Sequence, residues 1–193
     1  MDKLKTFKYY YVDDFISKDL QDKLEKDLLT NEVPYYYNQA TTNNLMPGLD
    51  KSNFNHIFEK EHFVHTFVSK GEKWSNNLDI VRPLIRSLPE KDELYRVKAN
   101  LMLQDKNGDP NTYNTPHYDF TEFAYYIALY YVNDSDGYTF LFDEDNNIMD
   151  RIQPKKGRMV FMRGDVLHAS RHPIKYKHRL VINMDIMAHD NRL

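Results

Sequence analysis

The sequence predicts a mainly β protein with N-terminal helices, whose strands form a double-stranded β-helix, or jelly roll. Three observations support this fold class. The 193 residues include 15 tyrosines and 11 phenylalanines, and aromatic residues favour strands. The apolar spacing changes near residue 95 from the helical period of 3.6 to the strand period of 2. About eight short strands follow, separated by turn residues at regular intervals.

The composition indicates one domain that spans residues 1–193. Hydrophobic residues make up 41% and charged residues 28%, which is typical of a folded chain. The absence of cysteine excludes zinc–thiolate and iron–sulfur sites, so a metal would be held by histidine and carboxylate groups. No apolar run approaches the ~20 residues of a membrane span or resembles a signal peptide, so we expect a cytoplasmic protein. With a net charge of -3, a nucleic-acid partner is not expected.

We expect residues 1–94 to form a helical and loop region that supports the core. Ser17 is suited to cap a helix that ends near residue 31. A second helical pattern covers residues 78–88, with Pro83 in its first turn or at a kink. Residues 32–75 show little periodicity, which predicts loops and short helical turns.

Residues 95–187 are expected to form the jelly-roll core. The first strand, from Tyr95 to Gln104, alternates between two distinct faces. On the last strand, Arg179 shares a face with Asn183, while the opposite face is apolar. The strands expected in addition to the first are 9–12, 123–132, 138–142, 148–152, 158–162, 166–170 and 178–186.

One pattern points to a metal site. His117-Tyr-Asp119 is the only His-x-Asp sequence in the chain, and residues i and i+2 of a strand point the same way. His168, 51 residues later on another predicted strand, is the third expected ligand. Two imidazoles and one carboxylate leave coordination positions open, which favours non-haem Fe(II) oxygen chemistry. The remaining histidines are interpreted as surface or hydrogen-bonded core residues: His56, His62, His65, His172, His178 and His189.

A resemblance to a known family rests on six segments that occur in the family's order. The segments are Thr115–Phe120, Ile127–Asn133, Gly137–Phe142, Pro154–Phe161, Gly164–Ala169 and His178–Asn183. With them, the stretch from Arg96 to Met184 resembles the 2-oxoglutarate/Fe(II)-dependent dioxygenases, especially the prolyl-4-hydroxylase-like branch of phages and bacteria. The resemblance implies that Fe(II) is held by the three ligands above, with 2-oxoglutarate as cosubstrate and O2 as oxidant. The chain departs from the family at Asp136-Gly137, in place of Gly-Gly, and at Asn100-Leu-Met102, in place of Asn-x-Tyr.

The resemblance also implies residues that bind the cosubstrate. Arg179, 11 residues after the second metal histidine, lies where the family has a cation for the far carboxylate. A guanidinium group can bind a carboxylate through two parallel hydrogen bonds. Tyr131 resembles the tyrosine that binds the same carboxylate, and Asn100 is a further candidate. Lys175 and Lys177 are alternatives to Arg179 if the strand register differs.

The implied reaction is hydroxylation of a substrate, with release of succinate and CO2. Asp119 favours hydroxylation, because related halogenases have a small residue there that leaves room for halide. The expected substrate is a prolyl or similar residue in a peptide or protein, and a small molecule is the alternative. Residues 34–44 form either part of a substrate groove or a packed loop.

Two other functions compete with this interpretation. A cupin-type metalloprotein with another activity is disfavoured because the chain has no His-x-His pair. A non-enzymatic jelly-roll binding module predicts no metal uptake. The nine Lys and Arg residues between 151 and 179 form either a solvated hairpin face or a positive site entrance.

Overall fold

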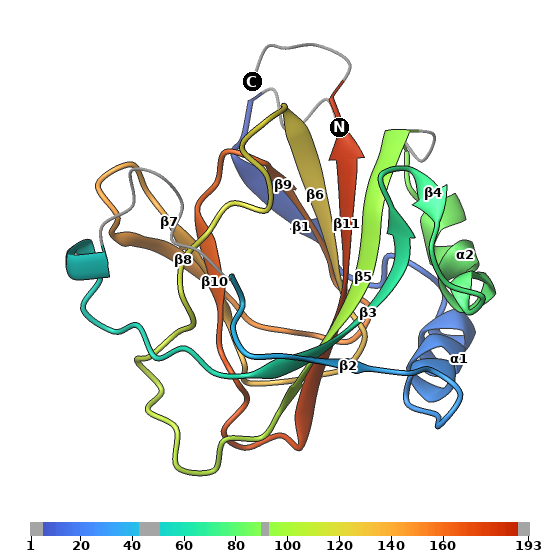
Figure 1. The fold of residues 1–193 in the computed structure, drawn as a ribbon, viewed down its shortest axis with the longest axis horizontal. Helices are drawn as coiled ribbons and strands as arrows, with labels where there is room; N and C mark the ends of the chain where they lie inside the picture. The colour runs from blue at the N-terminus through green and yellow to red at the C-terminus, as the bar shows by residue number, and fades with distance from the viewer. Residues whose placement is uncertain (1–5, 43–50, 90–92, 189–193) are drawn as a thin grey trace.

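Two antiparallel sheets form the centre of the molecule (Figure 1). The computed structural model describes residues 6–42, 51–89 and 93–188. The larger sheet has the strand order β1-β9-β6-β11-β5-β3-β2, with β4 paired to β3, and the smaller has the order β10-β7-β8. The strands are β1 (Tyr9–Val12), β2 (Tyr36–Asn38), β3 (His62–Ser69), β4 (Glu72–Lys73), β5 (Leu94–Leu103), β6 (Tyr125–Tyr131), β7 (Thr139–Phe142), β8 (Ile148–Ile152), β9 (Met159–Arg163), β10 (His168–Ser170) and β11 (His178–Met187).

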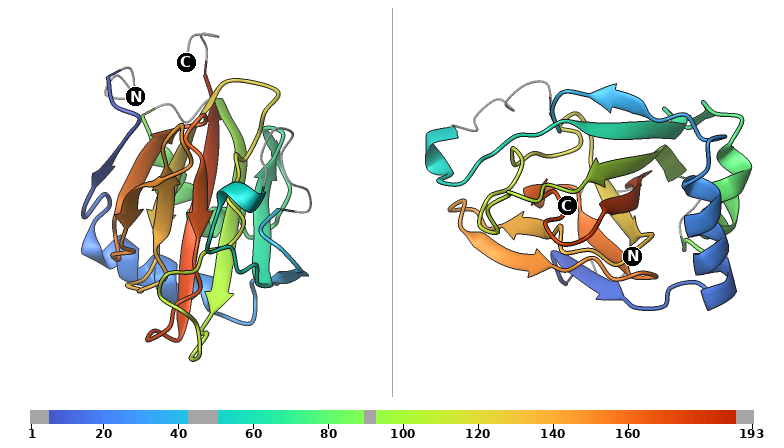
Figure 2. Two further views of the ribbon diagram at one scale, coloured as in Figure 1. Left: turned by 90° about the vertical axis from the view of Figure 1, so that its left-hand side faces the viewer. Right: turned by 90° about the horizontal axis from the view of Figure 1, so that it is seen from below.

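The predicted fold class, a mainly β jelly roll with N-terminal helices, is confirmed. The sheets lie one against the other, and the two long strands β5 and β11 run side by side through the middle of the larger sheet (Figure 2). Strands from the second half of the chain agree closely with the predicted ranges, and β8 has the bounds predicted for it. A short 3-10 helix, η2 (Lys51–Asn53), lies beside the smaller sheet (Figure 1).

Two helices cover the outer face of the larger sheet, as the sequence predicted. Helix α1 (Lys18–Leu28) and helix α2 (Leu78–Arg86) bury apolar side chains against the same face of β5, β6 and β11. Pro83 lies beyond the first turn of α2. In the part of the chain that is described, no helix has the length and apolarity needed to cross a bilayer.

Part of the basic segment near residue 155 holds α1 in place. The amino group of Lys156 lies 2.5 Å from the Asp22 carboxylate and 2.6 Å from the Glu25 carboxylate, both on α1. Lys155 and Arg158 pair with Asp13, just before that helix. These basic residues therefore contribute to packing, and each such exposed pair adds roughly 0–1 kcal/mol to stability.

The expectation of loops and helical turns over residues 32–75 is wrong for β2, β3 and β4. Strand β3 pairs with β5 and belongs to the larger sheet. Its pattern was obscured because His62 and His65, which are polar, are buried at 2% and 3% exposure. His65 is accommodated because its two ring nitrogens bond to the Pro34 carbonyl (2.7 Å) and the Ser75 hydroxyl (2.8 Å).

Polar side chains of β5 and β11 line the space between the two sheets. The opposite faces of both strands are apolar and pack under the helices. Arg96, Lys98 and Asn100 lie on the polar face of β5, opposite Asp185, Asn183 and Val181 of β11 respectively. This alternation, which follows the strand period of 2, places the functional residues inside the molecule rather than on its surface.

Candidate active site

The backbone brings His117 and His168 together at the edge of the smaller sheet. The N–H of His117 donates to the His168 carbonyl oxygen (2.9 Å), and the N–H of His168 donates to the His117 carbonyl oxygen (3.2 Å). This is an isolated bridge rather than a regular strand, the geometry that the interpretation of the His-x-Asp pattern assumed for residues 117–119. Pro116, which has no N–H to donate, interrupts the ladder directly before His117.

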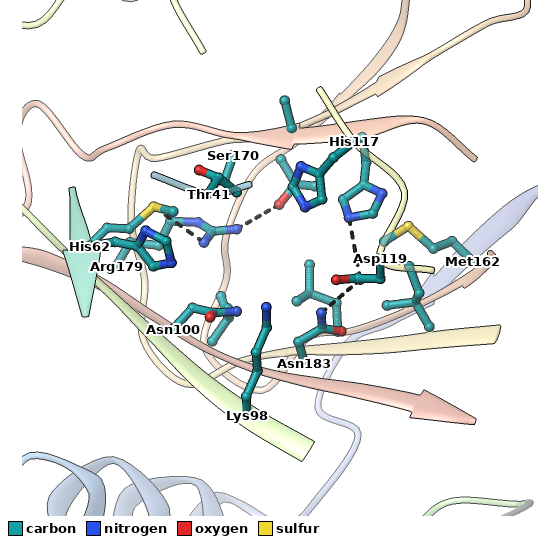
Figure 3. A pocket seen from close by; sticks show the side chains of 17 residues that line it. Thr41, His62, Lys98, Asn100, His117, Asp119, Met162, Ser170, Arg179 and Asn183 are labelled. Atoms are coloured by element: carbon teal, nitrogen blue, oxygen red, sulfur yellow. Dashed lines mark hydrogen bonds and ion pairs between the residues drawn. The ribbon is translucent and has the colours of Figure 1, made fainter. Parts of the chain in front are cut away.

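The three predicted metal residues come together in space (Figure 3). One ligand atom each from His117, Asp119 and His168 lies within 4.8 Å of the other two. His168 Nε2 lies 3.7 Å from Asp119 Oδ2. The Asp119 side chain is 3% exposed and that of His168 is 10% exposed, so the group is enclosed by protein.

Backbone carbonyl groups fix the orientation of both imidazoles. The Nδ1 atom of His117 lies 3.0 Å from the Thr115 carbonyl oxygen, and that of His168 lies 3.1 Å from the Val166 carbonyl oxygen. Because a carbonyl oxygen only accepts, each Nδ1 carries a proton, and in a neutral imidazole of this tautomer Nε2 has the lone pair. Burial and the neighbouring His168 lower the pKa of His117 to about 4, so His117 is neutral at pH 7. Two such nitrogens and a carboxylate suit a divalent transition metal.

Two side chains of the larger sheet hold the Asp119 carboxylate. Arg96 donates to its Oδ1 atom, and Asn183 Nδ2 donates to its Oδ2 atom at 3.0 Å. Arg96 also donates through Nε to Asp185 Oδ2 at 2.6 Å. Although burial favours the neutral form, Arg96 and Lys98 hold the pKa of Asp119 well below its usual range. Asp119 is therefore an ionised acceptor with a fixed orientation.

A cavity extends from these three residues between the sheets. It contains about 500 Å³ of empty space, counting the part open to solvent. The polar residues of its wall, apart from the three predicted ligands, are Thr41, His62, Lys98, Asn100, Thr139, Ser170, Arg179 and Asn183.

Arg179 lies in the cavity wall away from the predicted metal residues (Figure 3). Its Nη2 atom donates to Thr139 Oγ1 at 2.8 Å, and Tyr131 Oη donates to the same oxygen at 2.7 Å. Burial lowers the pKa of Arg179, but a guanidinium group stays charged at neutral pH. Tyr131 itself is fully buried; it contacts Thr139 through its hydroxyl group, and the Arg179 guanidinium carbon lies 5.7 Å from the centroid of its ring.

Several polar atoms of the cavity wall have no partner among the described residues. They include Arg179 Nε, Asn100 Oδ1 and His62 Nδ1, all of which are buried. Buried polar atoms are normally hydrogen-bonded to protein or to ordered water, so unpaired atoms around one cavity indicate that water or a polar ligand occupies it. Lys175 and Lys177, the alternatives to Arg179, are exposed.

Lys98, Arg96 and His62 were not predicted as site residues. Arg96 and Lys98 share one face of β5 with Asn100, which was predicted, so the same alternation could have identified them. His62 lies on β3, whose strand was not predicted. Among the other histidines, His172 is buried and hydrogen-bonded to the Leu103 carbonyl, His56 is exposed, and His189 lies outside the described residues.

Comparison with solved structures places this geometry in a known fold. A prolyl-4-hydroxylase of Pseudomonas putida has a TM-score of 0.61 and 16% identity over 98% of this chain and 97% of its own. A prolyl hydroxylase of Trichoplax adhaerens was solved in complex with a peptide fragment of hypoxia inducible factor. It has a TM-score of 0.66 and 14% identity, over 99% of this chain and 88% of its own. The fold is that of the 2-oxoglutarate/Fe(II) oxygenases.

Other structures with the oxygenase fold agree with this finding. The viral collagen prolyl hydroxylase of Paramecium bursaria Chlorella virus-1, in complex with 2-oxoglutarate, has a TM-score of 0.52 and 17% identity, over 95% of this chain and 98% of its own. No protein-family model and no curated protein matches the chain by sequence. The resemblance inferred from six short segments is therefore supported at the level of the fold.

Proposed function

We propose that the chain is an Fe(II)- and 2-oxoglutarate-dependent oxygenase that hydroxylates its substrate and releases succinate and CO2. The observation that carries the proposal is the convergence of His117, Asp119 and His168 at one end of a cavity that has Arg179 in its wall. These three side chains would hold a bound Fe(II) ion, which would supply the oxygen chemistry.

The residues around this group would orient the metal and the cosubstrate. The carbonyl oxygens of Thr115 and Val166 keep both Nε2 lone pairs directed at the metal position. Arg96 and Asn183 hold the Asp119 carboxylate. Arg179 supports binding of the far carboxylate of 2-oxoglutarate, because it is a buried cation whose Nε atom is still unpaired among the described residues.

A peptide or protein is the substrate class that we propose, with a prolyl or similar residue as the target. Strand β2 is an edge strand of the larger sheet, next to β3. All three of its residues are exposed, including Tyr36 and Tyr37. An exposed edge strand can pair with an extended peptide. Thr41, which follows this strand closely, lines the cavity. The peptide bound by the Trichoplax adhaerens protein supports the same class. Residues 43 and 44 of the predicted groove lie outside the described part of the chain.

The proposal is tested by metal and cosubstrate binding, followed by turnover. Under anaerobic conditions, the metal-free protein should bind one Fe(II) or Mn(II) ion and then one 2-oxoglutarate molecule. In air, the Fe(II) protein should convert 2-oxoglutarate to succinate, and proline-rich peptides should gain the mass of one oxygen atom.

Two variants make this experiment specific. His168→Ala should lose metal binding and succinate formation, while His56→Ala, which removes an exposed histidine, should keep both. Failure of the wild-type protein to bind metal would instead favour a non-enzymatic binding module. Metal binding without binding of 2-oxoglutarate would favour a cupin-type activity.

A further inference from the structure

Lys98 is a cation of the cavity wall that the proposed reaction does not use. It lies on β5 directly opposite Asn183 of β11, and Asn183 donates to the Asp119 carboxylate. Its amino group points into the cavity between Asn100 and Asn183 (Figure 3). Among the described residues, no hydrogen bond or ion pair to this amino group is found.

The position of Lys98 is near the metal end of the cavity rather than near Arg179. Arg179 lies opposite Met102, four residues farther along β5. A strand rises about 3.3 Å per residue, so the two backbone positions are separated by roughly 13 Å along the strand. A cosubstrate whose far carboxylate is bound at Arg179 leaves Lys98 beside the space where a substrate meets the metal.

Lys98 acts on the buried acids through its charge but makes no direct contact with either of them among the described residues. Arg96 alone contacts both carboxylates, those of Asp119 and Asp185. Burial and repulsion by Arg96 lower the pKa of Lys98. Without a bound ligand, the charged form of the Lys98 amino group is therefore disfavoured. A buried amine in this setting is stabilised by an anion that enters the cavity.

The charges of the complete site also leave room for an anion. When Asp185 is ionised, three cations (Arg96, Lys98 and Arg179) accompany two carboxylates (Asp119 and Asp185), so these side chains contribute one excess positive charge, and a proton on Asp185 increases the excess. A divalent metal and the dianion of 2-oxoglutarate cancel each other. The excess positive charge therefore persists after both have bound. We assign it to Lys98, which is the cation of the three without a hydrogen bond or ion pair among the described residues.

We propose that Lys98 binds a carboxylate of the substrate, next to the carbon that is oxidised. This inference rests on the proposed oxygenase function and narrows its substrate class. The preferred substrates are then small acids, or peptides whose target lies beside a free carboxylate at the chain end or on an acidic side chain. A neutral analogue would leave the Lys98 ammonium buried without a counter-charge, which disfavours its binding.

The test uses Mn(II)-loaded protein saturated with 2-oxoglutarate under anaerobic conditions. The probes are small carboxylic acids, each compared with its own primary amide, such as N-acetyl-L-proline with N-acetyl-L-prolinamide and propionate with propionamide. Relaxation of the probe protons by Mn(II), measured by NMR, reports both affinity and closeness to the metal. We expect the acids to bind about tenfold more tightly than the amides.

Four variants locate the effect at Lys98. Lys98→Met should abolish the preference for acids, and Lys98→Arg should retain it. Lys98→Gln serves as a second neutral variant if the methionine variant does not fold, and Lys177→Met removes an exposed lysine as a matched control. The affinity of Lys98→Met for 2-oxoglutarate, measured separately, should stay within about threefold of wild type.

The outcomes separate this inference from the function on which it rests. Equal binding of acids and amides by the wild-type protein would overturn the inference and leave the oxygenase proposal intact. A large loss of 2-oxoglutarate affinity in Lys98→Met would also overturn it, because the carboxylate at Lys98 would then belong to the cosubstrate. A wild-type protein that binds neither Mn(II) nor 2-oxoglutarate would overturn both.

Discussion

Thr139 has a single hydroxyl group, and two donors already point at its oxygen. Tyr131 Oη lies 2.7 Å from that oxygen and Arg179 Nη2 lies 2.8 Å from it. Because the oxygen accepts both bonds, the hydroxyl proton of Thr139 is left to donate to a ligand in the cavity. The contribution of Tyr131 is thus to orient Thr139, a relationship between three side chains that no sequence motif displays.

We predict that Thr139→Val weakens 2-oxoglutarate binding about tenfold without changing the affinity for Mn(II). The valine side chain keeps the shape of threonine but removes one donor to the carboxylate and the oxygen that accepts from Tyr131 Oη and Arg179 Nη2. Thr139→Ser, which retains the hydroxyl group, should bind nearly as wild type does. Calorimetric titration of the three proteins measures the effect, and equal affinities for valine and threonine would contradict it.

At the scale of elements, the turn before β7 is as important as the strand itself. Gly137 lies in this turn. A Cβ atom at that position would lie 2.5 Å from the Arg171 carbonyl oxygen and 2.9 Å from Arg179 Cδ. The sequence singled out the Gly137–Phe142 segment only by resemblance, whereas the structure shows that the glycine leaves space for the Arg179 side chain.

We predict that Gly137→Ala destabilises the protein by about 1–3 kcal/mol, because neither neighbouring segment can move without disturbing the sheet. It should also weaken 2-oxoglutarate binding by displacing Arg179. Gly108→Ala is the control, since its Cβ would meet less close contacts, with the Asp105 carboxylate at 3.0 Å and the Asp105 carbonyl oxygen at 3.2 Å. Urea denaturation and 2-oxoglutarate titration measure both effects, and an unchanged Gly137→Ala protein would show that the turn adapts.

The strand patterns could be predicted from the sequence, but the environment of each face could not. The alternation along β5 and β11 identified which residues share a face, and the structure confirms those faces. A polar face is usually exposed to water, whereas here it lines a cavity, so Arg96 and Lys98 were not recognised as site residues. Strand β3 was missed for the related reason that its buried histidines resemble surface residues in the sequence.

At the scale of the whole molecule, the buried charges make stability depend on pH. Burial, and then the neighbouring Asp119, raise the pKa of Asp185 to about 7, well above its ordinary value of 3.8. Between these two values the folded protein holds a proton at Asp185 that the unfolded chain releases. The contribution of Asp185 to the free energy of unfolding therefore decreases as the pH rises from about 4 to about 7, and then levels off.

We predict that Asp185→Asn removes this pH dependence. The stability of the variant relative to wild type should increase from pH 4 to pH 7 and stay constant above that. The pKa values of His62 and His117 are both lowered to about 4. We expect these residues to titrate equally in both proteins, so their contributions cancel in the difference in free energy of unfolding. Urea denaturation of metal-free protein at several pH values measures the difference, and a constant difference would show that Asp185 is ionised throughout.

Because of the reciprocal backbone hydrogen bonds between His117 and His168, the conformational entropy of the site is lost during folding rather than during ligand binding. Residues 51 positions apart are fixed beside each other as the chain folds, by bonds that involve no side chain. An arriving ion therefore meets donors that are already immobilised, and little further ordering opposes its binding. Preorganisation of this kind would make the metal-free and metal-bound conformations alike, so a metal held by the proposed ligands would bind after folding is complete.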